Sequence, residues 1–184
     1  VNPRTVELYD TRRGETLPLE PIEPGEVGMY VCGVTVYDLT HIGHARVYVF
    51  FDVVQRFLEH LGYEVTHVRN HTDVDDKIID RANEEGEEPL ELSQRYIDEF
   101  NKDMDTLGVE RPDHAPKVSE CVDEVIEMVQ KLQDKGFAYE VDGDVFYRVE
   151  NFEDYGKLSK KELEDLEAGR SGRTDEEADQ KKEH

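Results

Sequence analysis

The alternation of strand-like and helix-like segments in the first half of the chain constrains the fold most. The run "MYVCGV" (29–34) is β-rich and fits a buried strand, and the residues from His41 to His60 have the apolar spacing of a long helix. "YEVTHVRN" (63–70) fits a second strand, and "DVDDKIIDRANEEG" (73–86) fits a helix that begins with acidic residues and ends in glycine. This order predicts an α/β fold with a parallel sheet and crossover helices.

The ends of the two predicted strands indicate where a ligand would bind. In parallel α/β sheets, ligands bind beyond the carboxyl ends of the strands. Residues 32–35 lie at the end of the first strand, and residues 70–73 lie at the end of the second. We therefore expect the two stretches to line one crevice.

Two histidines lie at the start of the first predicted helix. His41 and His44 are three residues apart, so both rings lie on one face of the first turn. A helix start offers free N–H groups to an anion, and Gly43 lets a flat ring or a phosphate approach the backbone. Imidazoles aimed at developing phosphate charge suit phosphoryl-type chemistry. The alternative is a pair of partly buried capping histidines; the strand before and the helix after favour the functional interpretation.

Composition excludes several classes of protein. No apolar run is long enough to span a bilayer and no signal-like start is present, so we expect a cytoplasmic protein with no membrane partner. Cys32 and Cys121 lie far apart in different patterns, which argues against a disulfide framework. With 45 acidic and 22 basic residues the net charge is −23, typical of an acidic, halophilic surface. Taken alone, this charge argues against nucleic-acid binding, because phosphate contacts need Lys and Arg.

The second half of the chain predicts helices and a hairpin. "PLELSQRYIDEFNKDMDTLG" (89–108) has helical spacing, and the Pro-rich stretch "RPDHAPKV" (111–118) is expected to be a break. Ser119 is expected to cap a further helix, with Cys121 as a core residue on its apolar face. "FAYEVDGDVFYRV" (137–149) predicts a β-hairpin that turns at "DGD".

Several motifs together carry a resemblance to a known family. "THIGHAR" (40–46) resembles the HIGH motif of class I aminoacyl-tRNA synthetases. The longer string "MYVCGVTVYDLTHIGHAR", with "RNHTDVDDKII" (69–79) and "GDVFYRVENFEDYGKLS" (143–159), resembles the cysteinyl-tRNA synthetase family. The resemblance runs from about residue 5 to 170 and implies a Rossmann-like (HUP-type) α/β fold.

The resemblance also implies an activity and a set of site residues. Members of this family form a cysteinyl adenylate from L-cysteine and ATP, which binds with Mg²⁺, and then transfer the cysteinyl group to tRNA(Cys). His41 and His44 would be catalytic and, with Gly43, would bind ATP. Cys32 would be one ligand of a zinc ion that grips the substrate thiolate and so distinguishes cysteine from serine. The substrate-binding residues would be Cys32, Gly33, Val34, Thr35, Asn70 and Thr72.

Members of the family are longer than this chain, so we expect the chain to be an N-terminal portion that is inactive by itself. We expect the protein to be a monomer. The expected parts are half of the catalytic domain (1–112), the start of an α+β connective insertion (113–167) and a disordered tail or truncated linker (168–184). The lysine-rich KMSKS loop and the remaining zinc ligands are not found in the sequence. "GKLSKKELE" (156–164) lies in the wrong context for that loop.

Two other interpretations stay open. One is the related ligase that joins cysteine to a glucosamine-inositol sugar in mycothiol synthesis. Its pattern tends to have proline after the two aspartates and "TPYD" before the HIGH motif, whereas this chain has Lys77 and "TVYD", which favours the tRNA enzyme. The other is a non-catalytic fragment that binds a nucleotide or a partner without turnover.

Overall fold

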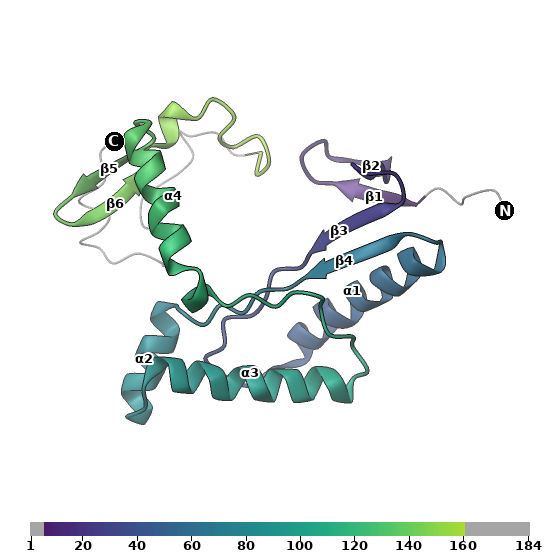
Figure 1. The fold of residues 1–184 in the computed structure, drawn as a ribbon, viewed down its shortest axis with the longest axis horizontal. Coiled ribbons are helices and arrows are strands. Elements are labelled where there is room, and N and C mark those ends of the chain that lie inside the picture. Colours follow the sequence, from purple (N-terminus) through teal and green to yellow (C-terminus); the bar gives the residue numbers. More distant parts are fainter. Residues whose placement is uncertain (1–5, 161–184) are drawn as a thin grey trace. The chain divides into compact units, whose positions relative to one another are not determined.

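The computed structural model describes residues 6–160, which form two compact units (Figure 1). The first unit is Glu20–Val122, and the second combines Val6–Leu19 with the chain from Asp123 onward. The segment predicted as a tail, 168–184, lies outside the described residues. The predicted site residues all belong to the first unit.

The first unit is built on a parallel pair of strands. β3 (Glu26–Tyr30) and β4 (Glu64–Val68) pair in parallel from Glu26↔Glu64 to Tyr30↔Val68 and lie side by side in Figure 1. Helix α1 (Ile42–His60) connects them, so the predicted strand–helix–strand order is confirmed. β3, however, ends at Tyr30 and not at residue 34 as the sequence predicts. Beyond Tyr30 the chain keeps pairing with the extension of β4, through the Thr35↔Thr72 bridge, without a regular ladder.

Helix α1 buries only part of its apolar surface. Its buried residues are Tyr48, Gln55 and Leu58. Of the apolar residues whose spacing predicts the helix, Phe50 is 61% exposed and Phe57 is 46% exposed. The described elements therefore leave one apolar side of α1 open.

Two further helices complete the core of the first unit. α2 (Asp76–Glu85) begins after Asp75, whose side chain accepts the Lys77 N–H, and ends at Gly86 in the left-handed conformation. α3 (Pro89–Thr106) carries proline in its first turn, where the missing N–H costs nothing. One buried cluster contains Val36, Ile78, Ala82, Leu92, Tyr96 and Ile97. The other contains Val31, Tyr48, Phe100, Met104 and Val109, so residues 32–35 are anchored in the core at both ends.

The Pro-rich stretch (111–118), predicted as a break, also pairs with β4 and its extension. His114 forms a parallel bridge with Val68, and Lys117 forms one with His71. The Arg69 N–H donates to the His114 carbonyl, and the His71 N–H donates to the Pro116 carbonyl. The stretch therefore covers the second edge of β4, because an unpaired strand edge would leave these backbone groups unsatisfied.

The second unit contains two hairpins and a helix. Its elements are β1 (Glu7–Asp10), β2 (Glu15–Pro18), α4 (Val122–Asp134), β5 (Ala138–Val141) and β6 (Asp144–Tyr147). The predicted hairpin turn is confirmed: Asp142 and Gly143 both have positive φ, 51° and 90°, as a tight two-residue turn requires.

Two predictions at the start of α4 are wrong. Ser119 does not cap that helix but lies in a 3₁₀ turn, η1 (Val118–Glu120), where its hydroxyl donates to Asp73. Cys121 precedes α4 and is only half-buried, so it is not a core residue of the helix. Among the described residues, no helix is long and apolar enough to cross a membrane.

Candidate active site

The two stretches predicted to share a crevice do meet. The Val36 N–H donates to the Thr72 carbonyl, and the Thr72 N–H donates to the Val34 carbonyl, both at 3.2 Å. The Gly33 N–H donates to Oδ1 of Asn70 at 2.8 Å. Residues 32–35 and 70–73 therefore lie against each other beyond the carboxyl ends of β3 and β4. This junction of strand ends, where the sequence predicts a ligand-binding crevice, is called the crevice below.

Gly33 is required by the closeness of this approach. A Cβ atom at position 33 would lie 1.7 Å from the Asn70 carbonyl oxygen, far inside van der Waals contact. Backbone atoms on both sides fix this separation, so a side chain cannot be accommodated by a change of rotamer. Gly33 thus shapes the crevice through its lack of a side chain.

The Asn70 side chain connects three segments of the crevice. Its Oδ1 atom accepts the Tyr30 hydroxyl at 2.8 Å as well as the Gly33 N–H. Its Nδ2 atom donates to Oγ1 of Thr72 at 3.1 Å. Sequence reasoning missed Tyr30, because a tyrosine near the start of the predicted strand (29–34) carries no signal of a partner forty residues away.

Cys32 presents its thiol to solvent. The residue is exposed and its Sγ lies 3.6 Å from the Gly33 carbonyl, so it is not a buried strand cysteine. The main chain of Cys32 is anchored to helix α1, because the hydroxyl of the buried Tyr48 donates a hydrogen bond to the Cys32 carbonyl at 3.2 Å. The thiol suits a zinc ligand by its chemistry. Within the part of the chain that the structure describes, however, no group of three or more His, Cys, Asp or Glu side chains gathers to complete a metal site.

His41 and His44 lie together, as their spacing predicts. Their rings stack with centroids 3.8 Å apart. Nδ1 of His41 accepts the Gly43 N–H at 3.0 Å, and Nδ1 of His44 accepts the His41 N–H at 3.3 Å. A backbone N–H can only donate, so both Nδ1 atoms are acceptors and each neutral ring carries its proton on Nε2. The two histidines therefore cap α1 and also offer two N–H donors.

Gly43 allows this stacked arrangement. A Cβ atom at position 43 would lie 2.8 Å from the His41 ring. Burial, and then the neighbouring His41 ring, lower the pKa of His44, which favours the neutral ring. The pair is also tied to α3, since the Thr40 hydroxyl donates to Asp103.

A second set of polar side chains lies on the other side of β4 and its extension. This buried row consists of His67, Arg69, His71 and Asp73, each at most 5% exposed. Asp73 accepts the Ser119 N–H at 2.9 Å and the Ser119 hydroxyl. The Arg69 guanidinium lies over the Tyr48 and Phe100 rings, 5.0 and 5.2 Å from their centroids. Burial raises the pKa of Tyr48 to about 12, so its hydroxyl keeps its proton.

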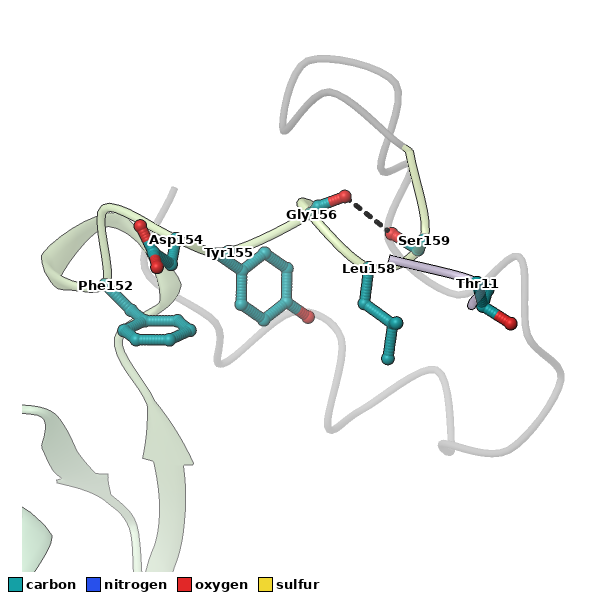
Figure 2. A pocket seen from close by; sticks show the side chains of 7 residues that line it. All are labelled: Thr11, Phe152, Asp154, Tyr155, Gly156, Leu158 and Ser159. Atoms are coloured by element: carbon teal, nitrogen blue, oxygen red, sulfur yellow. Dashed lines mark hydrogen bonds between the residues drawn. The ribbon is translucent and has the colours of Figure 1, made fainter. Parts of the chain in front are cut away.

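A hollow in the second unit does not coincide with any predicted site residue. It measures about 530 Å³ and lies between Thr11 and the segment 152–159. Figure 2 shows that rings and an aliphatic side chain, those of Phe152, Tyr155 and Leu158, dominate its lining. Asp154 contributes a carboxylate, which is paired with Lys157 and Arg12. We therefore place the candidate site at the strand ends, which carry the Cys32 thiol, and at the start of α1, which carries the two imidazoles.

The family model described as tRNA synthetases class I (C) catalytic domain matches residues 18–184. The chain belongs to this family. The parallel strands, the crossover helix and the stacked histidines at its start thus lie within a class I synthetase domain. The match confirms the predicted fold class, a Rossmann-like class I synthetase catalytic domain.

The curated relatives of this synthetase domain are longer proteins. A cysteine–tRNA ligase of Geobacter metallireducens is 52% identical over 165 residues, which cover 90% of this chain and 34% of that protein. The chloroplastic/mitochondrial cysteine–tRNA ligase of Arabidopsis thaliana is 53% identical over 162 residues, which cover 88% and 29%. The chain therefore spans about a third of the length of these relatives.

Solved structures agree on the fold. The agnB2 LeuRS of Agrobacterium radiobacter K84, in a ternary complex with tRNA and LeuAMS, matches 65% of this chain and 16% of that chain, with 25% identity and a TM-score of 0.54. The methionyl-tRNA synthetase of Mycobacterium tuberculosis, in complex with methionyl-adenylate, matches 61% of this chain and 23% of that chain, with 22% identity and the same TM-score of 0.54. Both likenesses support a class I synthetase fold for this chain.

Proposed function

We propose that the protein to which this chain belongs is a cysteine–tRNA ligase, which activates L-cysteine with Mg²⁺-bound ATP and transfers the cysteinyl group to tRNA(Cys). The observation that carries the proposal is an exposed thiol just beyond the end of β3 together with two stacked imidazoles at the start of α1, the helix that connects the two parallel strands. The names of the curated relatives support cysteine and tRNA as substrates and favour this activity over the mycothiol ligase. The proposed form is a cytoplasmic monomer.

In this proposal His41 and His44 act on the phosphates of ATP. Attack of the cysteine carboxylate on the α-phosphorus adds negative charge to the phosphate oxygens as pyrophosphate leaves. The Nε2–H groups of the two neutral rings would donate to those oxygens, and their Nδ1 atoms are held by the backbone. Donors that are already oriented stabilise developing charge without reorganisation, and each contributes roughly 10²–10³ in rate.

The amino-acid end of the substrate would occupy the strand ends. Cys32 has an exposed thiol at this junction, Asn70 and Thr72 are half-buried on the other strand end, and Val34 and Thr35 pair with Thr72 through their backbone. We propose Cys32 as one ligand of a zinc ion, which would supply thiolate recognition when bound. Loss of zinc from the full-length Cys32→Ser protein, measured by metal analysis against the parent, is the expected result; unchanged zinc content would remove Cys32 from the ligand set.

The activity is tested by ATP–pyrophosphate exchange in the full-length protein that contains this chain. Exchange should depend on cysteine, and serine should not replace it. His44→Asn keeps an acceptor for the His41 N–H but removes the Nε2 donor, so exchange should fall about 100-fold or more. His60→Asn changes an exposed histidine in the last turn of the same helix and should leave exchange near the parent rate. Absence of exchange, or equal exchange with serine, would sink the proposed function.

A further inference from the structure

Tyr30 lies next to the crevice, and a hydrogen bond holds its hydroxyl to the opposite strand end. It is the last residue of β3, and 63% of its surface is exposed. An exposed tyrosine is usually free to change rotamer, yet the hydroxyl of Tyr30 reaches Oδ1 of Asn70 at 2.8 Å. The ring is thus fixed between the end of β3 and the extension of β4.

The directions of the hydrogen bonds around Asn70 follow from one donor. The Gly33 N–H cannot accept, so the Asn70 atom that faces it must be the amide oxygen. The Tyr30 hydroxyl reaches the same oxygen and therefore donates its proton. This orientation leaves the amide nitrogen facing Oγ1 of Thr72, to which it donates at 3.1 Å.

The same logic extends to the Thr72 hydroxyl. A threonine hydroxyl has one proton and two acceptor lone pairs. Oγ1 of Thr72 accepts from Asn70, so its own proton is not used in that bond. Thr72 is half-buried at the crevice, next to Thr35 on the opposite strand end. Among the described residues no hydrogen bond uses the hydroxyl proton, so it can be donated to an acceptor atom of a ligand bound beside the strand ends.

We infer that Tyr30 is a positioning residue for amino-acid binding: it fixes the Asn70 amide so that the Thr72 hydroxyl donates a hydrogen bond to the bound amino acid. The chain of donors runs from Tyr30 to Asn70 to Thr72 and ends in the crevice. The inference rests on the proposed function for the identity of the substrate, but the hydrogen-bond chain itself does not depend on it.

The first experiment needs no activity. Tyr30→Phe, made in the chain described here, removes one of two donors at Oδ1 of Asn70 and should speed amide exchange of Gly33, measured by NMR, about 3- to 10-fold. Exchange of Ala82, buried in α2, should not change, which excludes general loosening. Tyr9→Phe is the matched control, because Tyr9 is 65% exposed and lies in the second unit. Unchanged Gly33 exchange in Tyr30→Phe, or an equal increase in Tyr9→Phe, would overturn the inference.

The second experiment tests the role in binding. In the full-length protein, Tyr30→Phe should raise KM for cysteine several-fold while KM for ATP and kcat stay near the parent values. Asn70→Asp keeps acceptors for Tyr30 and Gly33 but captures the Thr72 proton, so it should raise KM for cysteine more than Tyr30→Phe does. An equal rise in KM for ATP, or an unchanged KM for cysteine, would refute the positioning role. Absence of cysteine-dependent ATP–pyrophosphate exchange would contradict the proposed function. The Gly33 amide-exchange experiment would then still show whether the hydrogen bonds from Tyr30 to Asn70 exist.

Discussion

Alternate residues along β4 and its extension serve two different surfaces. Asn70 and Thr72 are half-buried, bond to each other and to the end of β3, and border the crevice. The buried row on the other side, His67 to Asp73 at every second position, is covered by α1, α3 and the 3₁₀ turn. Successive side chains of an extended strand point to opposite faces, so one short stretch supplies both sets.

The two sets differ in how their polar groups are satisfied. At the crevice, three of the four hydrogen-bonding positions of the Asn70 amide are used within the protein. The hydroxyl of Thr72 accepts one of these bonds, and its own proton makes no hydrogen bond among the described residues. In the buried row, Nε2 of His67, Nε of Arg69 and Nδ1 of His71 have no partner among the described residues. Buried polar groups without partners cost stability, so changes in the buried row should act on folding and changes at the crevice on binding. Gly33 is the exception at the crevice: because a Cβ atom there would overlap the Asn70 backbone, its substitution should act on folding as well as on binding.

The largest expected effect is that of Gly33→Ala. Its Cβ would overlap the Asn70 carbonyl at 1.7 Å, so the two strand ends must separate. The free energy of unfolding should fall by about 3 kcal/mol, as for a severe overpacking change. Urea denaturation measures this, with Gly28→Ala as control, because a Cβ on Gly28 in β3 meets nothing within 4 Å. Similar stability of the two variants would show that the strand ends are not held together as described.

Asp73→Ala should be the most costly change in the buried row. It removes the acceptor of the Ser119 N–H and hydroxyl, leaves both donors unsatisfied and opens a gap. A loss of about 2 kcal/mol in unfolding free energy is expected. Asp76→Ala removes an exposed carboxylate from the first turn of α2 and should cost about 0.5 kcal/mol. Equal losses would mean that the Asp73–Ser119 contact contributes little.

The buried histidines should make stability depend on pH. Burial, followed by the charge of Arg69, lowers the pKa of both His67 and His71 below the ordinary value of 6.5. Between the folded and unfolded pKa values the unfolded chain binds more protons, so stability is complete above pH 6.5 and falls as the pH drops. His71→Leu should reduce this slope by about 1 kcal/mol per pH unit, measured by urea denaturation from pH 7.5 to 5. An unchanged slope would show that His71 is not desolvated in the folded protein.

The same comparison shows what the sequence could predict. The strand–helix order, the meeting of residues 32–35 with 70–73 and the pairing of His41 with His44 all follow from periods and spacings along the chain. The partners of Tyr30 and Ser119 could not be predicted, because these contacts join residues 40 and 46 positions apart and depend on tertiary packing. In "HVRNHTD" (67–73) a charged or imidazole side chain occurs at every second position, which could have indicated a row on one face of a strand. Without the helices that cover this face, however, the stretch resembles a half-exposed strand.

The smallest effect on stability is expected at Thr72, where the effect on binding should be clearest. Thr72→Val keeps the β-branched shape but removes the hydroxyl that accepts from Asn70 and donates into the crevice. Because the residue is half-buried and the Asn70 Nδ2 group can turn to water, the unfolding free energy should change by less than about 0.5 kcal/mol. In the full-length protein, KM for cysteine should nevertheless rise more than in Tyr30→Phe, since the donor itself is lost. A large loss of stability with an unchanged KM would place Thr72 with the buried row and remove the distinction between the two surfaces.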